Sequence, residues 1–125
     1  MAAENKSYKE IWLKDPRDSN YPAAMDYLDL LFSGEKPKKI VQRLKKCETV
    51  MKKAKDILRA SELPLLPPDN IHVKDNIEKV NSGIKLSPVL LVRSHKLIIA
   101  DGYHRVCSIY YLSEDLDIPC RITHI

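Results

Sequence analysis

The stretch LIIADGYHRVCSIYYL, residues 97–112, joins an apolar run to a helical pattern and decides the fold. Residues 97–100 are typical of a buried strand, whereas residues 103–112 repeat apolar side chains at the spacing of a helix. Gly102 lies between the two and permits a tight turn. Because unbonded N–H groups collect where a helix begins, the sequence predicts an anion site over residues 101–105.

The second half of the chain predicts a small sheet with helices, an α+β fold. PVLLVR (88–93) and LIIA (97–100) are separated by a short turn and predict a hairpin. Apolar residues alternate with other types over residues 118–123, where Ile118, Cys120 and Ile122 recur at every second position, and this predicts a last strand. A helix is predicted from Val73 to a stop at Gly83. Residues 61–70 contain three prolines and predict a connector with one short edge strand.

The first half predicts two helices that cover this domain. Residues 1–20 are polar and are expected to be a leader with little structure of its own. Residues 21–59 form the N-terminal helical segment, and residues 60–125 the domain itself. The first helix would be capped by Asn20. The second would run over 36–59, where apolar residues recur four and three apart from Ile40 to Leu58.

The chain has 125 residues, a length that predicts one domain, and a net charge of +4. The positive charge gathers in residues 36–59, which hold ten Lys or Arg against two acidic residues. The sequence shows neither a secretory signal nor an apolar run of roughly 20 residues, so it predicts a cytoplasmic protein that does not span a membrane. Its three cysteines form no CxxC pair and are expected to be free thiols, and no metal site is predicted.

Residues 57–125 resemble the ParB/sulfiredoxin-like fold superfamily, and in particular small uncharacterised bacterial ParB-like proteins. The resemblance rests on the order of a proline-rich connector, a short helix, SPVLLVR, KLIIADGYHRVCSIYYL and IPCRI. It implies a compact domain with a small mixed sheet, to which the two N-terminal helices are added. It also implies that the turn over residues 101–105 holds the ligand.

The turn differs from those of the characterised members. Sulfiredoxins have a redox Cys after the Gly, where this chain has Tyr103, so sulfiredoxin activity is not expected. ParB proteins of the chromosome-partition type have Gly-Glu-Arg-Arg and bind CTP and DNA; only the last Arg matches, at Arg105. Free-serine kinases of this fold are more similar, because Asp101, Gly102 and Arg105 are all shared with them.

Phosphate binding is the chemistry expected of the turn. The N–H groups of Tyr103, His104 and Arg105 would face the phosphate, and Gly102 would allow it to approach closely. Arg105, expected to be exposed, would be the principal contact because its planar cation can grip a phosphate through two hydrogen bonds. Lys74 lies on the preceding helix and is a further candidate for ligand contact, as are Asn76 and Lys85; all three could also be solvated surface residues.

Two residues of the turn leave alternatives open. Asp101 could cap the helix through its side chain, or act as a base or as a ligand to magnesium. His104 could contact the phosphate or act as a general acid, since its ordinary pKa lies near neutrality, or it could be a structural histidine.

The function expected is therefore phosphate or nucleotide binding, with a nucleoside phosphate and Mg as the candidate cofactor. One alternative is a nucleotide-dependent phosphotransferase or ParB-like nuclease, with Asp101 and His104 as its catalytic residues. Another is a non-catalytic DNA-binding or protein-interaction module, in which the basic helix over 38–55 would contact nucleic acid phosphates.

Overall fold

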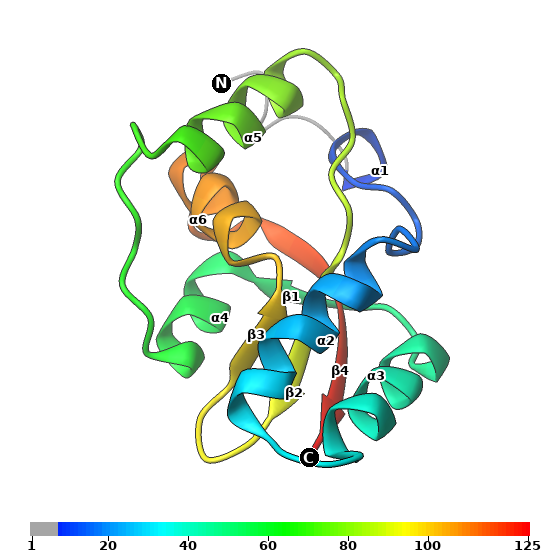
Figure 1. Ribbon diagram of the computed structural model, residues 1–125. Helices are drawn as coiled ribbons and strands as arrows, with labels where there is room; N and C mark the ends of the chain where they lie inside the picture. Colours follow the sequence, from blue (N-terminus) through cyan, green and yellow to red (C-terminus); the bar gives the residue numbers. More distant parts are fainter. Residues whose placement is uncertain (1–7) are drawn as a thin grey trace.

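The computed structural model describes residues 8–125, which form a four-stranded mixed sheet flanked by helices (Figure 1). In chain order the elements are α1 (Tyr8–Ile11), α2 (Asn20–Leu31), α3 (Lys36–Lys46), β1 (Val50–Lys53), α4 (Ala54–Ser61), α5 (Ile71–Asn81), β2 (Val89–Arg93), β3 (Ile98–Asp101), α6 (Tyr103–Leu112) and β4 (Asp117–His124). The predicted α+β class is confirmed.

The strands lie in the order β1-β4-β2-β3. β2 pairs antiparallel with β3, which confirms the predicted hairpin, and pairs in parallel with β4. β1 pairs antiparallel with the other side of β4. The last strand of the chain therefore lies inside the sheet, between two strands that precede it.

The side chains of β2 alternate between two apolar cores. Val89 and Leu91 belong to the larger core, which contains residues of α4, α5 and α6. Leu90 and Val92 belong to the smaller core, with α2 and α3. A strand that is buried on both faces is apolar at successive positions, which explains the run VLLV. The expectation that two N-terminal helices pack on the sheet is met by α2 and α3.

The single helix predicted over 36–59 is wrong. α3 ends at Lys46, β1 follows, and α4 begins at Ala54. Ile40 is buried in the smaller core and Leu58 in the larger one. The regularly spaced apolar residues therefore pack on opposite faces of the sheet. The chain crosses the sheet edge between the two helices, and pairing of β1 with β4 overrides the local helical pattern. Residues 38–55 are therefore not one basic helix, and nucleic-acid contact by them stays a prediction.

The leader predicted to have little structure is wrong for its described part, residues 8–20. Ile11 and Trp12 are each only 2% exposed and belong to the larger core. The Leu13 N–H donates to the Leu86 carbonyl at 2.8 Å, and the Leu86 N–H donates to the Ile11 carbonyl at 2.8 Å. These bonds fix the segment beside the chain that enters β2. Residues 1–7 of the predicted leader lie outside the described residues.

Local details at two helix starts also differ from expectation. Asn20 does not cap α2: it is the first helical residue, and its Oδ1 accepts a hydrogen bond from the Arg17 N–H at 2.7 Å. Asn70 caps α5, because its Oδ1 accepts from the N–H groups of His72 and Val73. α5 then ends near Gly83 as predicted, but residues 62–70 form no strand.

The predicted boundary between the N-terminal helical segment and the domain, between residues 59 and 60, falls inside α4. β1 lies before this boundary and pairs with β4, so the sheet contains residues from both sides of it. Helix lengths are modest, and α2, with 12 residues, is well short of the roughly 20 needed for a membrane span. Over residues 8–125, no helix is both long and apolar enough to cross a membrane.

Trp12→Ala is expected to lower the free energy of unfolding by about 3–5 kcal/mol, because it empties a large buried site in the core. Urea unfolding followed by circular dichroism measures the change. Leu30→Ala is the matched control: this side chain is 82% exposed, so the change should stay within about 0.5 kcal/mol. Similar small losses for both variants would contradict the packing of the N-terminal segment.

Candidate functional site

The turn between β3 and α6 is shaped by Gly102, which has a φ of +113°. A Cβ at this position would lie 2.5 Å from Cγ1 of Val89 and 2.9 Å from Nη2 of Arg105. The glycine is thus required both by its backbone conformation and by its contact with β2. The tight turn was expected from the sequence, but the contact between Gly102 and β2 was not.

A cavity of about 280 Å³ lies between α5 and the start of α6. It is lined by His72, Asp75, Asn76, Lys79, Asp101, Gly102, His104 and Arg105. Four of the predicted site residues therefore meet in one place, and all four come from the turn and the first residues of α6.

Two other predicted site residues lie elsewhere. The Tyr103 hydroxyl donates a hydrogen bond to the carbonyl of Pro64 in the connector, and the Tyr103 side chain does not line the cavity. Lys74 is exposed on α5 and does not line the cavity either. Of the other two candidates near this helix, Asn76 lines the cavity and Lys85 does not.

Asp101 forms an ion pair with Arg105, with 3.3 Å between Oδ2 and Nη2. The interpretation of Asp101 as a side-chain cap is wrong, because Gly102 is the residue at the cap position and no side-chain cap bond forms there. The pair spans four residues along the chain, and the carboxylate reaches the guanidinium from the end of β3. Asp101 therefore holds the Arg105 head near the helix start.

Arg105 is less exposed than the sequence suggested, since only 17% of its side chain is accessible. Burial lowers the pKa of this guanidinium, whereas the Asp101 carboxylate acts in the opposite direction. Nη2 donates to Asp101 and, at 3.4 Å, to the carbonyl of Pro88. Nε is buried and has no hydrogen-bond partner within the described residues. The guanidinium is thus held through one terminal nitrogen.

The rings of His104 and His72 are in contact at the cavity wall, with 4.8 Å between the ring centroids and an edge-on arrangement. Burial, followed by the neighbouring His72 and Arg105, lowers the pKa of His104. An imidazole with a lowered pKa is neutral near pH 7, so one of its ring nitrogens can accept a hydrogen bond.

Sequence reasoning missed His72, Asp75 and Lys79, although a signal for them was present. The three residues are spaced three and four apart, so they share one face of α5, and Asn76 lies beside them. Lys79 forms an ion pair with Asp75 at 3.1 Å. Nothing in the sequence could have revealed Arg17, whose charge acts on Arg105 across 88 residues and lowers its pKa.

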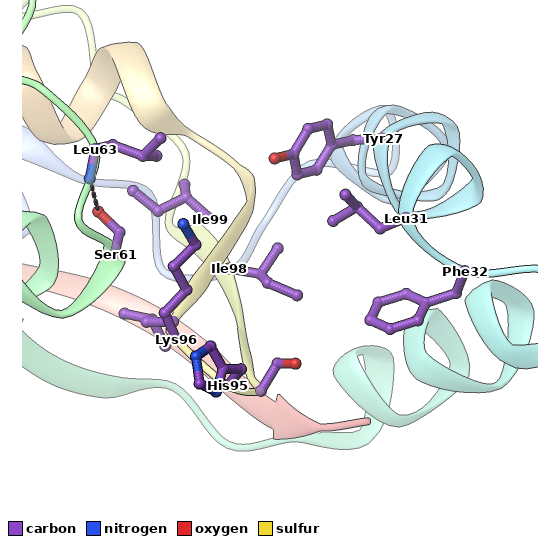
Figure 2. Close-up of a pocket in the computed structure, with 11 residues that line it drawn as sticks. Tyr27, Leu31, Phe32, Ser61, Leu63, His95, Lys96, Ile98 and Ile99 are labelled. Carbon is purple, nitrogen blue, oxygen red and sulfur yellow. Dashed lines mark hydrogen bonds between the residues drawn. The ribbon is translucent and has the colours of Figure 1, made fainter.

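A second cavity, of about 290 Å³, differs in chemistry from the first (Figure 2). Tyr27 and Leu31 of α2 line one side together with Phe32, which directly follows the helix, and Leu63 of the connector lines the other. Figure 2 shows Ile98 of β3 directed toward the α2 side chains, with Lys96 on the other side of Ile98, toward Ser61. This groove is mainly apolar, so it offers a phosphate little beyond the ammonium of Lys96 and the ring of His95.

The cysteines are free thiols, as predicted. Cys107 and Cys120 are both buried. Burial raises the pKa of Cys107 and raises that of Cys120 to about 12, so neither thiol ionises near neutral pH. Cys107 therefore does not replace the redox Cys that sulfiredoxins have in the turn. In the described part of the chain, no group of three or more His, Cys, Asp or Glu side chains is arranged to hold a metal ion.

Gly102→Ala is expected to lower the free energy of unfolding by about 3 kcal/mol or more, because backbone strain adds to the collision with Val89. Gly34→Ala is the control: its φ is also positive, at +66°, but nothing lies within 4 Å of the added Cβ. The control should lose only about 1 kcal/mol. Denaturant unfolding compares the two, and equal losses would show that contact with β2 does not matter.

Comparison with known proteins finds no family model that matches this chain and no similar curated protein or solved structure.

Proposed function

We propose that this protein binds the phosphate of a nucleoside phosphate, or of another phosphate ligand, in the cavity at the start of α6. The observation that carries the proposal is the placement of Arg105. Its guanidinium lines the cavity while Asp101 and the Pro88 carbonyl engage only Nη2. A cation that is oriented before the ligand arrives loses less entropy on binding.

The helix start supports the same proposal. The hydrogen bonds of α6 begin at Val106, whose N–H donates to the Gly102 carbonyl at 3.0 Å. The preceding N–H groups, those of Tyr103, His104 and Arg105, have no acceptor within the helix. Such groups and the positive end of the helix dipole favour an anion at this point.

Two further cations lie near the cavity. The Lys79 ammonium lines it, although it is paired with Asp75. Arg17 is exposed and lies close enough to repel the charge of Arg105. Like charges held close together are unfavourable, and an anion between them would relieve the repulsion.

In this proposal Asp101 positions Arg105, and no reaction step is assigned to Asp101 or His104. A nucleotide would bring its own magnesium ion, which is usually held by phosphates together with one or two carboxylates. Among the described residues, the carboxylates that line the cavity are those of Asp75 and Asp101, and each is paired with a cation. The phosphate is therefore the part of the ligand that the protein contacts. The three cysteines are free thiols, as is usual for proteins of the reducing cytoplasm, and this supports a cytoplasmic location.

A thermal-shift screen tests the proposal with ATP, ADP, CTP, GTP and inorganic phosphate, each with and without magnesium. A ligand that binds only the folded protein raises the melting temperature by mass action. The absence of any shift at millimolar concentrations would contradict the proposal.

Arg105→Gln is expected to weaken the binding of the best ligand by roughly 1.5–3 kcal/mol, about ten- to hundredfold, because one charge-assisted contact is lost. Isothermal titration calorimetry measures the affinity, and circular dichroism confirms that the variant folds. Arg59→Gln is the matched control, since Arg59 also pairs with an aspartate, Asp56, but is exposed on α4.

Lys79→Gln provides a second test should Arg105→Gln fold poorly, because the Lys79 side chain is 43% exposed. It is expected to weaken binding by a smaller factor. Unchanged affinity in both folded variants would place the site elsewhere.

Asp101→Asn is expected to tighten phosphate binding by several-fold. The substitution removes a negative charge from the cavity lining, while the Asn oxygen still accepts a hydrogen bond from Arg105. Glu114→Gln removes an exposed acid outside the cavity and serves as the control. If Asp101→Asn instead abolishes a magnesium-dependent turnover of the nucleotide, Asp101 takes part in catalysis and the protein is an enzyme.

A further inference from the structure

The fixed charges that line the cavity balance one another. Lys79 is paired with Asp75 at 3.1 Å, and Arg105 with Asp101 at 3.3 Å. Both pairs lie among the lining residues, so each cation is accompanied by a carboxylate that repels a phosphate. These four side chains together carry no net charge, so they attract a doubly charged anion only weakly.

The other titratable groups of the lining are His72 from α5 and His104 from α6. Their rings lie 4.8 Å apart in an edge-on arrangement. Histidine is the side chain type that commonly changes its charge between pH 5 and 8. His72 is exposed and His104 is half-buried. An anion bound at the start of α6 would lie beside this pair, because both rings line the same cavity as the helix start.

The surroundings of His104 favour its neutral form. Burial, His72 and Arg105 all lower the pKa of its ring. The charged groups that face the pair are Asp75 and Lys79 on α5, and Asp101 and Arg105 on the other wall. The Tyr103 ring, 5.8 Å from that of His104, is neutral in this pH range.

We propose that His72 and His104 add positive charge to the phosphate site, beyond that of Arg105, by taking up a proton when the anion binds. This inference rests on the proposed phosphate-binding function and assigns His72 a part in it. The linkage is reciprocal: an anion that favours the protonated rings must itself bind more tightly when the rings are protonated. Affinity therefore rises as the pH falls.

The test uses sulfate, because sulfate remains a dianion over the whole range, whereas phosphate changes its own charge near neutral pH. Sulfate affinity is measured by calorimetry at pH 6 and pH 8, with ionic strength held constant by chloride. The wild-type protein is expected to bind sulfate about tenfold more tightly at pH 6 than at pH 8, because proton uptake and anion binding are linked.

His72→Gln and His104→Gln are each expected to lose most of this pH dependence. Because His72 is exposed, His72→Gln should fold normally even if His104→Gln does not. His95→Gln is the control: His95 is exposed on the β2–β3 turn and lines the apolar groove of Figure 2. It should keep the full tenfold change.

The outcomes separate the two proposals. Equal sulfate affinity at pH 6 and pH 8 in the wild-type protein overturns this inference and leaves the proposed function intact. A full tenfold change that survives in His72→Gln overturns the part assigned to His72. If neither sulfate nor phosphate binds at any pH between 6 and 8, the proposed function fails, and this inference fails with it.

Discussion

The burial of β2 on both faces is the constraint on which the rest of the structure depends. Val89–Arg93 pairs with β3 on one side and with β4 on the other. Its side chains enter two cores, so the helices of both layers are positioned by the same strand. Val89 also packs against Gly102, which brings the start of α6 directly onto β2. The position of the candidate site therefore follows from the position of this strand.

The site also shows how a rigid scaffold can hold a charge close to a helix start. β3 ends at Asp101, and the helix that begins two residues later returns Arg105 to it. The other wall of the cavity is one face of α5, which packs along α6 (Figure 1). The Ser108 hydroxyl links these two helices by donating to the Val73 carbonyl at 3.0 Å. Two packed helices and a strand end thus fix the groups that line the cavity.

The sequence predicted those elements whose pattern is set by their own residues. The β2–β3 hairpin, α2, α5, α6 and the last strand were all expected, because each carries a clear apolar period and, in most cases, a Gly or Pro boundary. β1 could not be predicted, since its residues Val50–Lys53 are exposed and its pairing partner lies about 70 residues away. Trp12 was missed for a similar reason: its burial depends on contact with the segment around Leu86.

Within the site, the turn itself was predictable and its electrostatics were not. The Asp-Gly-Tyr-His-Arg sequence placed Asp101, Gly102, His104 and Arg105 together, and the structure keeps them together. The ion pair of Asp101 with Arg105 depends on how the strand end meets the first turn of the helix, which a residue pattern does not specify. The direction of Tyr103 toward Pro64 likewise depends on the path of the connector.

The central place of β4 has a consequence for how the chain folds during synthesis. Among the elements of residues 8–125, β4 is made after the others, yet it lies in the sheet between β1 and the β2–β3 hairpin. Before residues 117–124 leave the ribosome, β1 has no partner strand, and the sheet on which α3 and α4 pack is incomplete. Contacts between residues far apart in the sequence form slowly because a long loop must close first. Lys52 and Lys53 on β1 discourage pairing with other chains during this interval, as lysines on strand edges commonly do.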